Sequence, residues 1–323
     1  MNIELFLANG DRVFDAGKVC VGDIVLASSR SGGPASLRFN IVRDGIVDFV
    51  EGNRVVLKVD GVSLFSGIVF TKSRDKNQII SVVVYDQIRY LRNRDSYVFC
   101  NITASQIVRM IANDFRLEVG EIEDTGYVIP ARSCNNKTLM DMIYTGLDMT
   151  FRHTGRMFVL FDDLGRLSLK SVENMSLPLV LASKGGLIDY NYETSIDRGA
   201  FNRVKLSINP GRNQLMRYFT ANDEARVREW GVLQYTEHIT EDYNDAQMQN
   251  LAQTMLLNKN KVARTLNLEA FGDVRVKAGN CIYVHIPNIG DLDVNRLLMI
   301  NRCTHIFRND EHIMRLEMEG DLD

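Results

Sequence analysis

The sequence predicts a mainly β protein with a small α/β insert. Residues 52–86 contain three runs rich in β-branched and aromatic residues, separated by Asp60-Gly61 and by a charged turn at 74–77. The same order of strand, loop, strand, turn and strand returns at residues 279–318. Helical patterns lie between the two copies. The repeat of one β unit suggests two related barrels or sheets, one on each side of the insert.

Composition restricts the classes of protein to consider. With 323 residues, 45% of them hydrophobic, the chain should hold about two or three domains. Lys and Arg number 38 against 41 Asp and Glu, which gives a net charge of −3 and provides no basic field for nucleic acid or anionic membrane. The five cysteines are scattered, which is typical of reduced cytosolic thiols. We therefore expect a cytoplasmic chain without a secretion signal and without membrane insertion.

Residues 1–98 are expected to form the first β domain. The first fifty residues alternate apolar and polar side chains, which predicts short strands with one loop at Ser28 to Pro34. That loop lacks the Lys-Ser/Thr ending of a phosphate-binding loop, so we assign it no ligand. The first meander follows, with strands expected at Val55–Val59, Leu64–Thr71 and Ile79–Tyr85.

Residues 99–182 are expected to form the α/β insert. Thr103 and Gln106 make a capping box that begins one helix. A second helix is expected from Lys137 to Arg152 with Asn136 as its N-cap. Its inward stripe is Leu139, Met142, Ile143, Leu147 and Phe151. The sequence Asp162-Asp163-Leu164-Gly165 then predicts the turn of a hairpin, because Asp and Gly supply the backbone conformations that tight turns need.

Residues 183–323 are expected to form the second β domain. Strands are predicted at 187–192, 201–208, 215–220 and 232–238, and Trp230 is interpreted as a core residue. One helix should begin after Asn244, which forms a capping box with Gln247. The second meander follows, with strands at 281–286, 297–307 and 312–318.

Four residues are a candidate metal set: Cys281, His285, Cys303 and His305. On strands, residues two or four apart share a face, so the two pairs could meet as two thiolates and two imidazoles around zinc. Buried cysteines are common as small apolar residues, and the two strands need not pair in that register. We favour core packing and assign no metal and no cofactor.

Three acidic pairs are candidate hydrolase centres, since glycosidases use two carboxyl groups about 5–10 Å apart. The pairs are Asp162 with Asp163, Glu121 with Glu123, and Asp291 with Asp293. The first is explained more simply by the hairpin turn. None of the five histidines lies beside a nucleophile signature, although members of a triad need not be adjacent in sequence. We assign no catalytic residue.

An ordered series of short motifs carries a family resemblance over about residues 36–175. The motifs are Asn53 to Gly61, Leu64 to Val69, Val82 to Asp86, Tyr90-Leu91, Thr103 to Ile107, Thr138 to Ile143, Thr154-Gly155 and Gly165 to Leu169. In this order the chain resembles the XkdQ-type hub proteins of contractile phage and phage-like baseplates, which are akin to late-control gene D proteins and to the N-terminal region of VgrG. Residues 183–323 match mainly in the order of elements.

This resemblance implies two tube-like β barrels per chain and a homotrimer whose six barrels join the six-fold tail tube to the three-fold spike. Implied partners are the central spike protein, the first tail-tube ring, the tape-measure protein, and LysM-type and wedge baseplate proteins. No small-molecule substrate and no enzymatic activity are implied. The chain would reside in the bacterial cytoplasm before assembly and in the baseplate of a phage, prophage or bacteriocin tail afterwards.

Interfaces are expected along the exposed edges of the two meanders, where unpaired strands can be covered by neighbouring chains. The chosen residues are Leu64, Phe65, Ile68, Phe70, Leu297, Met299 and Phe307. Two other function classes remain open. One is a peptidoglycan-degrading tail hydrolase, with Asp162 and Asp163 as the residues to test, and the other is an effector-delivery module like VgrG.

Overall fold

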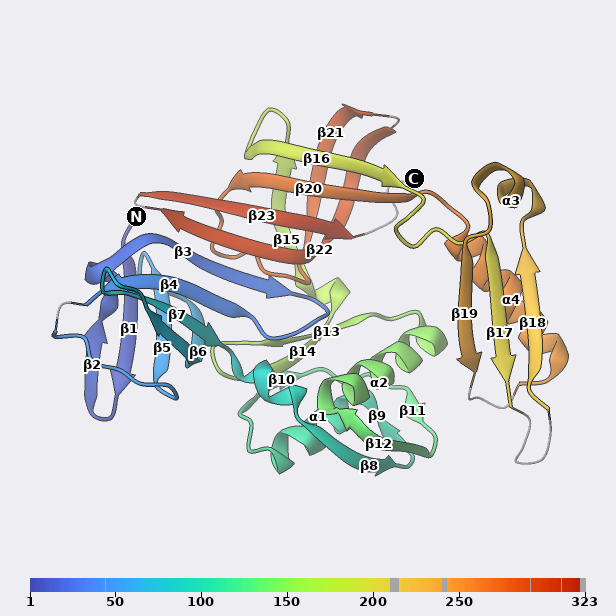
Figure 1. Cartoon of the computed structure of the whole chain (residues 1–323), viewed down its shortest axis with the longest axis horizontal. Helices are drawn as coiled ribbons and strands as arrows, with labels where there is room; N and C mark the ends of the chain where they lie inside the picture. Colours follow the sequence, from blue (N-terminus) through green and yellow to red (C-terminus); the bar gives the residue numbers. More distant parts are fainter. Residues whose placement is uncertain (44, 210–214, 240–242, 291, 309, 320–323) are drawn as a thin grey trace. The chain divides into compact units, whose positions relative to one another are not determined.

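The structure is a computed structural model that describes residues 1–43, 45–209, 215–239, 243–290, 292–308 and 310–319 (Figure 1). The chain divides into two compact units. Unit 1 contains Met1–Tyr190 and the described residues from Asn267 onward, and unit 2 is Asn191–Leu266. The domain boundaries expected at residues 98 and 182 both fall inside unit 1 and stay predictions.

Unit 1 begins with seven strands that include the first meander. They are β1 (Ile3–Asn9), β2 (Arg12–Asp15), β3 (Cys20–Ser29), β4 (Ser36–Val42), β5 (Arg54–Val59), β6 (Val62–Arg74) and β7 (Ile79–Tyr85), with the short 3-10 helix η1 (Ala16–Val19) after β2. The three predicted runs are β5, β6 and β7, and all pair antiparallel as expected. Alternate residues of these strands enclose one apolar core, in which Leu5, Leu57 and Val84 are completely buried.

The C-terminal strands contain the predicted second meander. They are β15 (Ser176–Ala182), β16 (Leu187–Ser195), β20 (Ala263–Phe271), β21 (Cys281–Ile289), β22 (Leu292–Arg308) and β23 (Glu311–Glu319). Strands β21, β22 and β23 pair antiparallel in chain order, as the repeat predicted. Strand β15 adds to the outer side of β21 in parallel.

Strand β22 joins the two meanders into one sheet. It is 17 residues long, and its first half pairs with β21 while its second half pairs with β3. The resulting sheet has 13 strands: eleven run in order from β16 through β20, β23, β22, β3, β4, β7, β6, β5 and β1 to β2, and β21 and β15 branch off at β22. The mainly β class with an α/β insert is confirmed. A division into two separate barrels stays a prediction, because hydrogen bonding is continuous across β22 and β3.

The insert contains two helices and short strands (Figure 1). Its elements are η2 (Gln87–Arg92), β8 (Arg94–Phe99), β9 (Ile102–Thr103), α1 (Ala104–Asp114), β10 (Val119–Ile122), β11 (Val128–Ile129), β12 (Arg132–Thr138), α2 (Leu139–Thr154), β13 (Phe158–Asp162), β14 (Leu167–Ser171) and η3 (Val172–Met175). The capping box of α1 is present, with Thr103 Oγ1 accepting from Gln106 N. Both helices bury one face in a core of their own, separate from the core of β1–β7.

The expected start of the second helix was wrong by two residues. Thr138 is the N-cap of α2, and its Oγ1 accepts from Asp141 N at 3.0 Å. Strand β12 continues to Thr138, and Asn136 has a φ of 49° beside a register shift in the β12–β8 pairing. Asn tolerates this left-handed conformation, so it serves a bulge rather than a cap. Phe151, expected on the inward stripe, is 44% exposed.

Unit 2 is a three-stranded sheet covered by one helix. Its elements are β17 (Arg203–Ile208), β18 (Arg217–Asn222), α3 (Glu224–Trp230), β19 (Gln234–Ile239) and α4 (Asp245–Lys259). Val204 and Leu206 of β17 pack with Met248 and Ala252 of α4, whose predicted capping box is present. Helix α3 was not predicted. Trp230 ends it half-buried under the Arg226 guanidinium, so the interpretation of Trp230 as a core residue was wrong.

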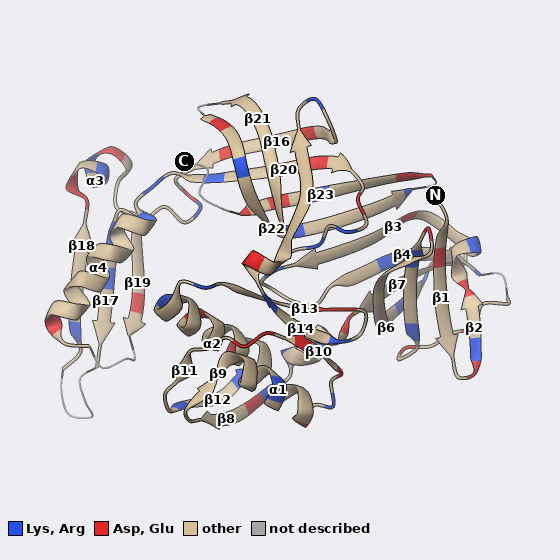
Figure 2. Cartoon of the chain, turned by 180° about the vertical axis from the view of Figure 1, so that it is seen from behind, with Lys and Arg blue, Asp and Glu red and all other residues tan. Residues whose placement is uncertain are grey.

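Charged residues are spread over both units. Figure 2 shows basic and acidic segments scattered among strands and helices rather than gathered on one element, consistent with the net charge of −3. Many are paired across strands, as in the bidentate contact of Arg308 with Asp23 at 2.7 Å. None of the helices in the described part of the chain has the length and apolar character needed to span a membrane.

Candidate functional site

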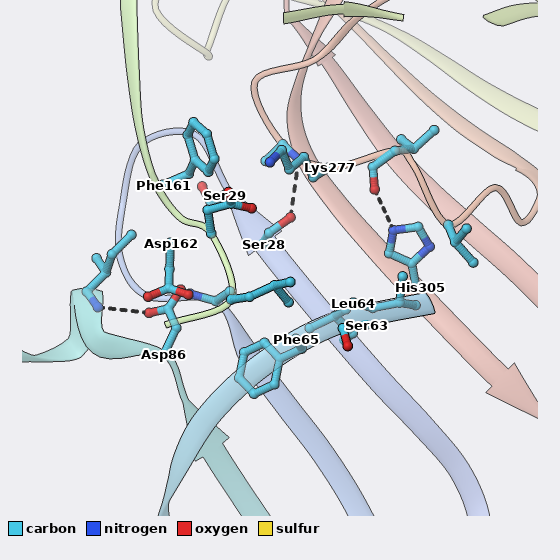
Figure 3. A pocket seen from close by; sticks show the side chains of 18 of the residues that line it. Ser28, Ser29, Ser63, Leu64, Phe65, Asp86, Phe161, Asp162, Lys277 and His305 are labelled. Carbon is cyan, nitrogen blue, oxygen red and sulfur yellow. Dashed lines mark hydrogen bonds between the residues drawn. The ribbon is translucent and has the colours of Figure 1, made fainter. Parts of the chain in front are cut away.

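A cavity of about 240 Å³ lies in unit 1 (Figure 3). Strands β3, β6 and β22, the turn between β13 and β14, and the loop 272–280 contribute to its walls. The apolar part comes from side chains such as Leu26, Phe65 and Leu160. The polar part includes three carboxyl groups, an arginine, a lysine and a histidine, which come from segments far apart in sequence: Asp86, Asp162, Asp163, Arg275, Lys277 and His305.

Asp86 is fixed at the point where the chain leaves β7 and enters the insert. It is the N-cap of η2, where Oδ1 accepts from Ile88 N at 3.1 Å and Oδ2 accepts from Ala35 N at 3.0 Å. The side chain is 3% exposed. These two backbone hydrogen bonds hold the carboxyl group in one orientation, and they tie the start of the insert to the loop before β4.

Asp162 reaches the same cavity from the predicted hairpin turn. Its Oδ1 accepts from Gly165 N at 2.6 Å, while Leu164 and Gly165 take positive φ values of 54° and 91°. Asp162 and Gly165 serve the turn as predicted, whereas the left-handed conformation of Leu164 was not expected from its residue type. Oδ2 is buried and has no hydrogen-bond partner of standard geometry, although the amide groups of Gln87 lie near enough to lower the pKa of Asp162.

The two carboxyl groups face each other in the cavity (Figure 3) and interact electrostatically. Burial raises the pKa of Asp162 to about 6. Burial, followed by repulsion from Asp162, raises the pKa of Asp86 well above its usual range. Two buried like charges cannot both ionise cheaply, so the pair favours a state with at least one proton.

Lys277 and His305 also line the cavity, and His305 is bonded to His312. Burial lowers the pKa of Lys277, whose ammonium group lies over the Phe161 ring. His305 Nε2 lies 2.8 Å from Val276 O, and its Nδ1 lies 2.9 Å from His312 Nε2. A carbonyl only accepts, so Nε2 carries the proton of neutral His305, and Nδ1 accepts from His312.

The four residues of the candidate metal set are not brought together. Cys303 Sγ lies 3.3 Å from His305 Nε2, but His285 is exposed and bonds Asn295 Oδ1. Cys281 and His285 share a sheet face with their partners Met299 and Asn295, whereas a register shift after Ile300 turns Cys303 and His305 to the other face. Among the described residues no cluster of three or more His, Cys, Asp or Glu side chains is arranged to hold a metal ion.

The residues chosen as interface positions divide into two groups. Phe65 and Phe307 are 5% and 1% exposed and belong to the core of the first β region, so they are not surface residues of the chain. Leu297 is 52% exposed, and Leu64, Ile68, Phe70 and Met299 are half-buried. Neither β6 nor β22 is an edge strand, because each pairs on both sides. The expectation that these strands form exposed edges was wrong.

The other acidic residues considered have structural partners. Glu121 pairs with Lys170 at 2.7 Å, and Glu123 accepts from Ser171 N at 2.9 Å. Asp293 Oδ1 accepts from Asn288 N in a turn, and Asp291 lies outside the described residues. Asp163 is exposed while its neighbour Asp162 points into the cavity.

Sequence reasoning missed the pairing of Asp86 with Asp162. Only the N-cap pattern of Asp86 before Gln87-Ile88 was readable locally, and nothing in the chain indicates a partner 76 positions later (162 − 86). With Asp86 almost fully buried, a polysaccharide cannot reach both carboxyl groups. The arrangement can bind and release a proton, and it is unsuited to glycoside hydrolysis.

Comparison with known proteins identifies relatives over nearly the whole chain. The family model described as YQBQ-like matches residues 24–319. The phage-like element PBSX protein XkdQ of Bacillus subtilis is 33% identical over 271 residues, covering 83% of this chain and 81% of that protein. The protein YqbQ of the same organism is 32% identical with the same coverage.

Solved structures show the same fold at low sequence identity. The 43 kDa tail protein of prophage MuSo2 from Shewanella oneidensis has a TM-score of 0.71 at 14% identity, covering 99% of this chain and 100% of that one. The E. coli c3393 protein, described as a type VI secretion component similar to the T4 tail proteins gp27 and gp5, has a TM-score of 0.57 at 10% identity, covering 99% of this chain and 78% of that one. The chain shares the fold of phage tail proteins.

Proposed function

The chain belongs to the YQBQ-like family, and from this premise we propose that it is a structural baseplate hub of a contractile injection system. In this role it joins the six-fold tail tube to the three-fold spike and nucleates baseplate assembly. The relative XkdQ is named as part of a phage-like element, and the fold is that of tail proteins. The observation that carries the proposal is the continuous sheet in which two meanders of one chain are joined through β22 and β3.

A trimer follows from the proposal by symmetry. Three chains, each with two meander units, present six similar units to a six-fold partner. Three strands of the sheet pair on one side only among the described strands: β2 with β1, β16 with β20, and β15 with β21; β2 and β16 end its main order. Open strand edges invite pairing with another chain, and both strands carry exposed apolar side chains, Val13 at 64% and Ile188 at 43%. We propose that β2 of one chain meets β16 of the next.

The proposed partners are those of a hub: the spike protein, the first tube ring, the tape-measure protein, and LysM-type and wedge proteins. The outer faces of α1 and α2 are the proposed contact for wedge or LysM-type proteins. The chain would remain in the cytoplasm until assembly places it in the baseplate. No enzymatic step is proposed, since the acidic residues considered earlier serve turns, ion pairs and the buried Asp86–Asp162 pair.

Cysteine cross-linking in assembled particles tests the proposed ring. The double variant Val13→Cys with Ile188→Cys, in a background where exposed Cys100 is Ser, should give a covalent species of three chains with a short bis-maleimide. Each single variant is the matched control and should stay monomeric. Intact particles from which the double variant yields only monomers, or a ladder beyond three chains, would overturn the head-to-tail trimer.

A further inference from the structure

We propose that Asp86 and Asp162 share one proton, and that loss of this proton releases the β13–β14 turn from the first turn of η2. This device is independent of the proposed hub function, because it depends only on contacts inside unit 1. It makes the joint between the first β region and the insert sensitive to pH.

The geometry leaves one position for a shared proton. Asp86 uses both oxygens to accept backbone N–H groups, and Asp162 uses Oδ1 for Gly165 N. Asp162 Oδ2 is buried and has no hydrogen bond of standard geometry, although the Gln87 amides lie near it, and Asp162 lines the same cavity as Asp86 (Figure 3). A proton on Oδ2 removes the charge from this buried acceptor, and with it the repulsion between the two carboxyl groups.

The elements that close the cavity supply few compensating charges. Asp163 of the turn opposes ionisation of Asp162, while the Gln87 amides favour it. The loop 272–280 supplies two cations to the lining: Arg275, which pairs with Asp273, and Lys277, whose pKa is lowered by burial. Tyr144 of α2, which donates to Arg30 O at 2.9 Å, and neutral His305 of β22 complete the titratable surroundings. Arg54 of β5 lies beside Gly165 and donates to Ser66 Oγ at 3.1 Å.

The sign of the effect follows from the direction of the shifts. Both carboxyl groups have a folded-state pKa above their unfolded value. The closed state, in which the β13–β14 turn contacts η2, therefore holds a proton that the open state gives up. The closed state is therefore complete below about pH 4 and is weakened as the pH rises through about 6. For one proton, the opening constant should rise by up to about tenfold per pH unit above that point.

Hydrogen–deuterium exchange of the full chain between pH 5 and 8.5 tests this, with intrinsic exchange rates divided out. Protection of the amides of Gly165 and Ile88 should fall by about tenfold or more across this range in the native chain. In Asp162→Asn the side chain at this position is neutral at every pH and its amide oxygen can still accept from Gly165 N, so protection of Gly165 should stay high and nearly constant. Asp163→Asn removes a neighbouring exposed carboxyl group and should keep the native response.

Two results would overturn the proposal. One is corrected protection in the native chain that does not change with pH. The other is a pH response in Asp162→Asn as steep as that of Asp163→Asn. If Asp162→Asn does not fold, ¹³C NMR of the aspartate carboxyl carbons in the native chain decides the question: the proposal requires one proton on the pair at pH 6, and full ionisation of both groups there contradicts it.

Discussion

Phe307 shows how one residue connects the two meanders. It is carried by β22 but is buried to 1% exposure in the core of the first β region, stacked on His312 with ring centroids 4.4 Å apart. The register shift after Ile300 directs it inward, because a slip of one residue moves a strand's side chains to the opposite face. Sequence pattern alone could not reveal this, since alternation is readable but a bulge is not.

Phe307→Ala should destabilise the chain by about 3–5 kcal/mol, because it removes a buried ring and leaves a cavity. Leu297→Ala on the same strand is the matched control, and its 52% exposed side chain should cost less than about 1 kcal/mol. Urea denaturation followed by far-UV circular dichroism measures both. Equal effects of the two substitutions would refute the placement of Phe307 in the core.

The pair of His305 and His312 should make the stability of unit 1 depend on pH in the acidic range. Burial and the neighbouring His305 lower the pKa of His312 to about 4, and burial lowers the pKa of His305. A second proton on His305 would set its Nδ1–H against the His312 N–H. Folded-state pKa values below the unfolded value give stability that is complete above pH 6.5 and is lost as the pH falls toward 4.

The native chain should lose unfolding free energy as the pH falls from 6.5 to 4. In His312→Gln this acid limb of the stability curve should be smaller by about 1–3 kcal/mol. His285→Gln replaces an exposed histidine of the same sheet and should leave the limb unchanged. Thermal unfolding at half-unit pH steps compares the two variants with the native chain. An acid limb in His312→Gln as steep as the native one would contradict the assignment.

At the scale of elements, the strands and helices with strong local signals were predictable. The β-branched runs of β5, β6 and β7, the turn at Asp162 to Gly165, and the capping boxes of α1 and α4 all formed as expected. Helix α3 was missed because it is a short helix with no buried residue, so it has no apolar stripe to read. The cap predicted at Asn136 is wrong because the extent of β12 depends on its pairing with β8, which local sequence does not show.

Strand β6 is packed so closely that one methyl group should disrupt it. A Cβ on Gly67 would lie 2.5 Å from Tyr85 O and 2.7 Å from the Phe65 ring. Gly67→Ala should cost about 2 kcal/mol or more, since the backbone of β7 would have to move. Gly185→Ala, where a Cβ meets no atom within 4 Å, should change stability by less than about 1 kcal/mol. Thermal unfolding measures both variants. Similar midpoints for the two would show that this packing is wrong.

At the scale of the whole molecule, the decisive contacts are those that join distant parts of the chain. Arg302↔Ser29 through Phe307↔Ile24 align strands that are more than 270 residues apart. No local periodicity encodes that pairing, so the duplicated meander was visible in the sequence while the continuous sheet was not. The Asp86–Asp162 pair was hidden for the same reason. The expected interface edges at β6 and β22 became interior strands once these long-range pairs formed.

The measurement that most directly tests the hub function is quantitative mass spectrometry of sedimented tail particles from the producing bacterium. Copies of this chain are counted against the tube protein, with particles from cells lacking the chain as the control. The account predicts about three copies per particle, as a single trimer requires, and no assembled tails in the control. Complete tails that sediment without this chain would contradict the central claim.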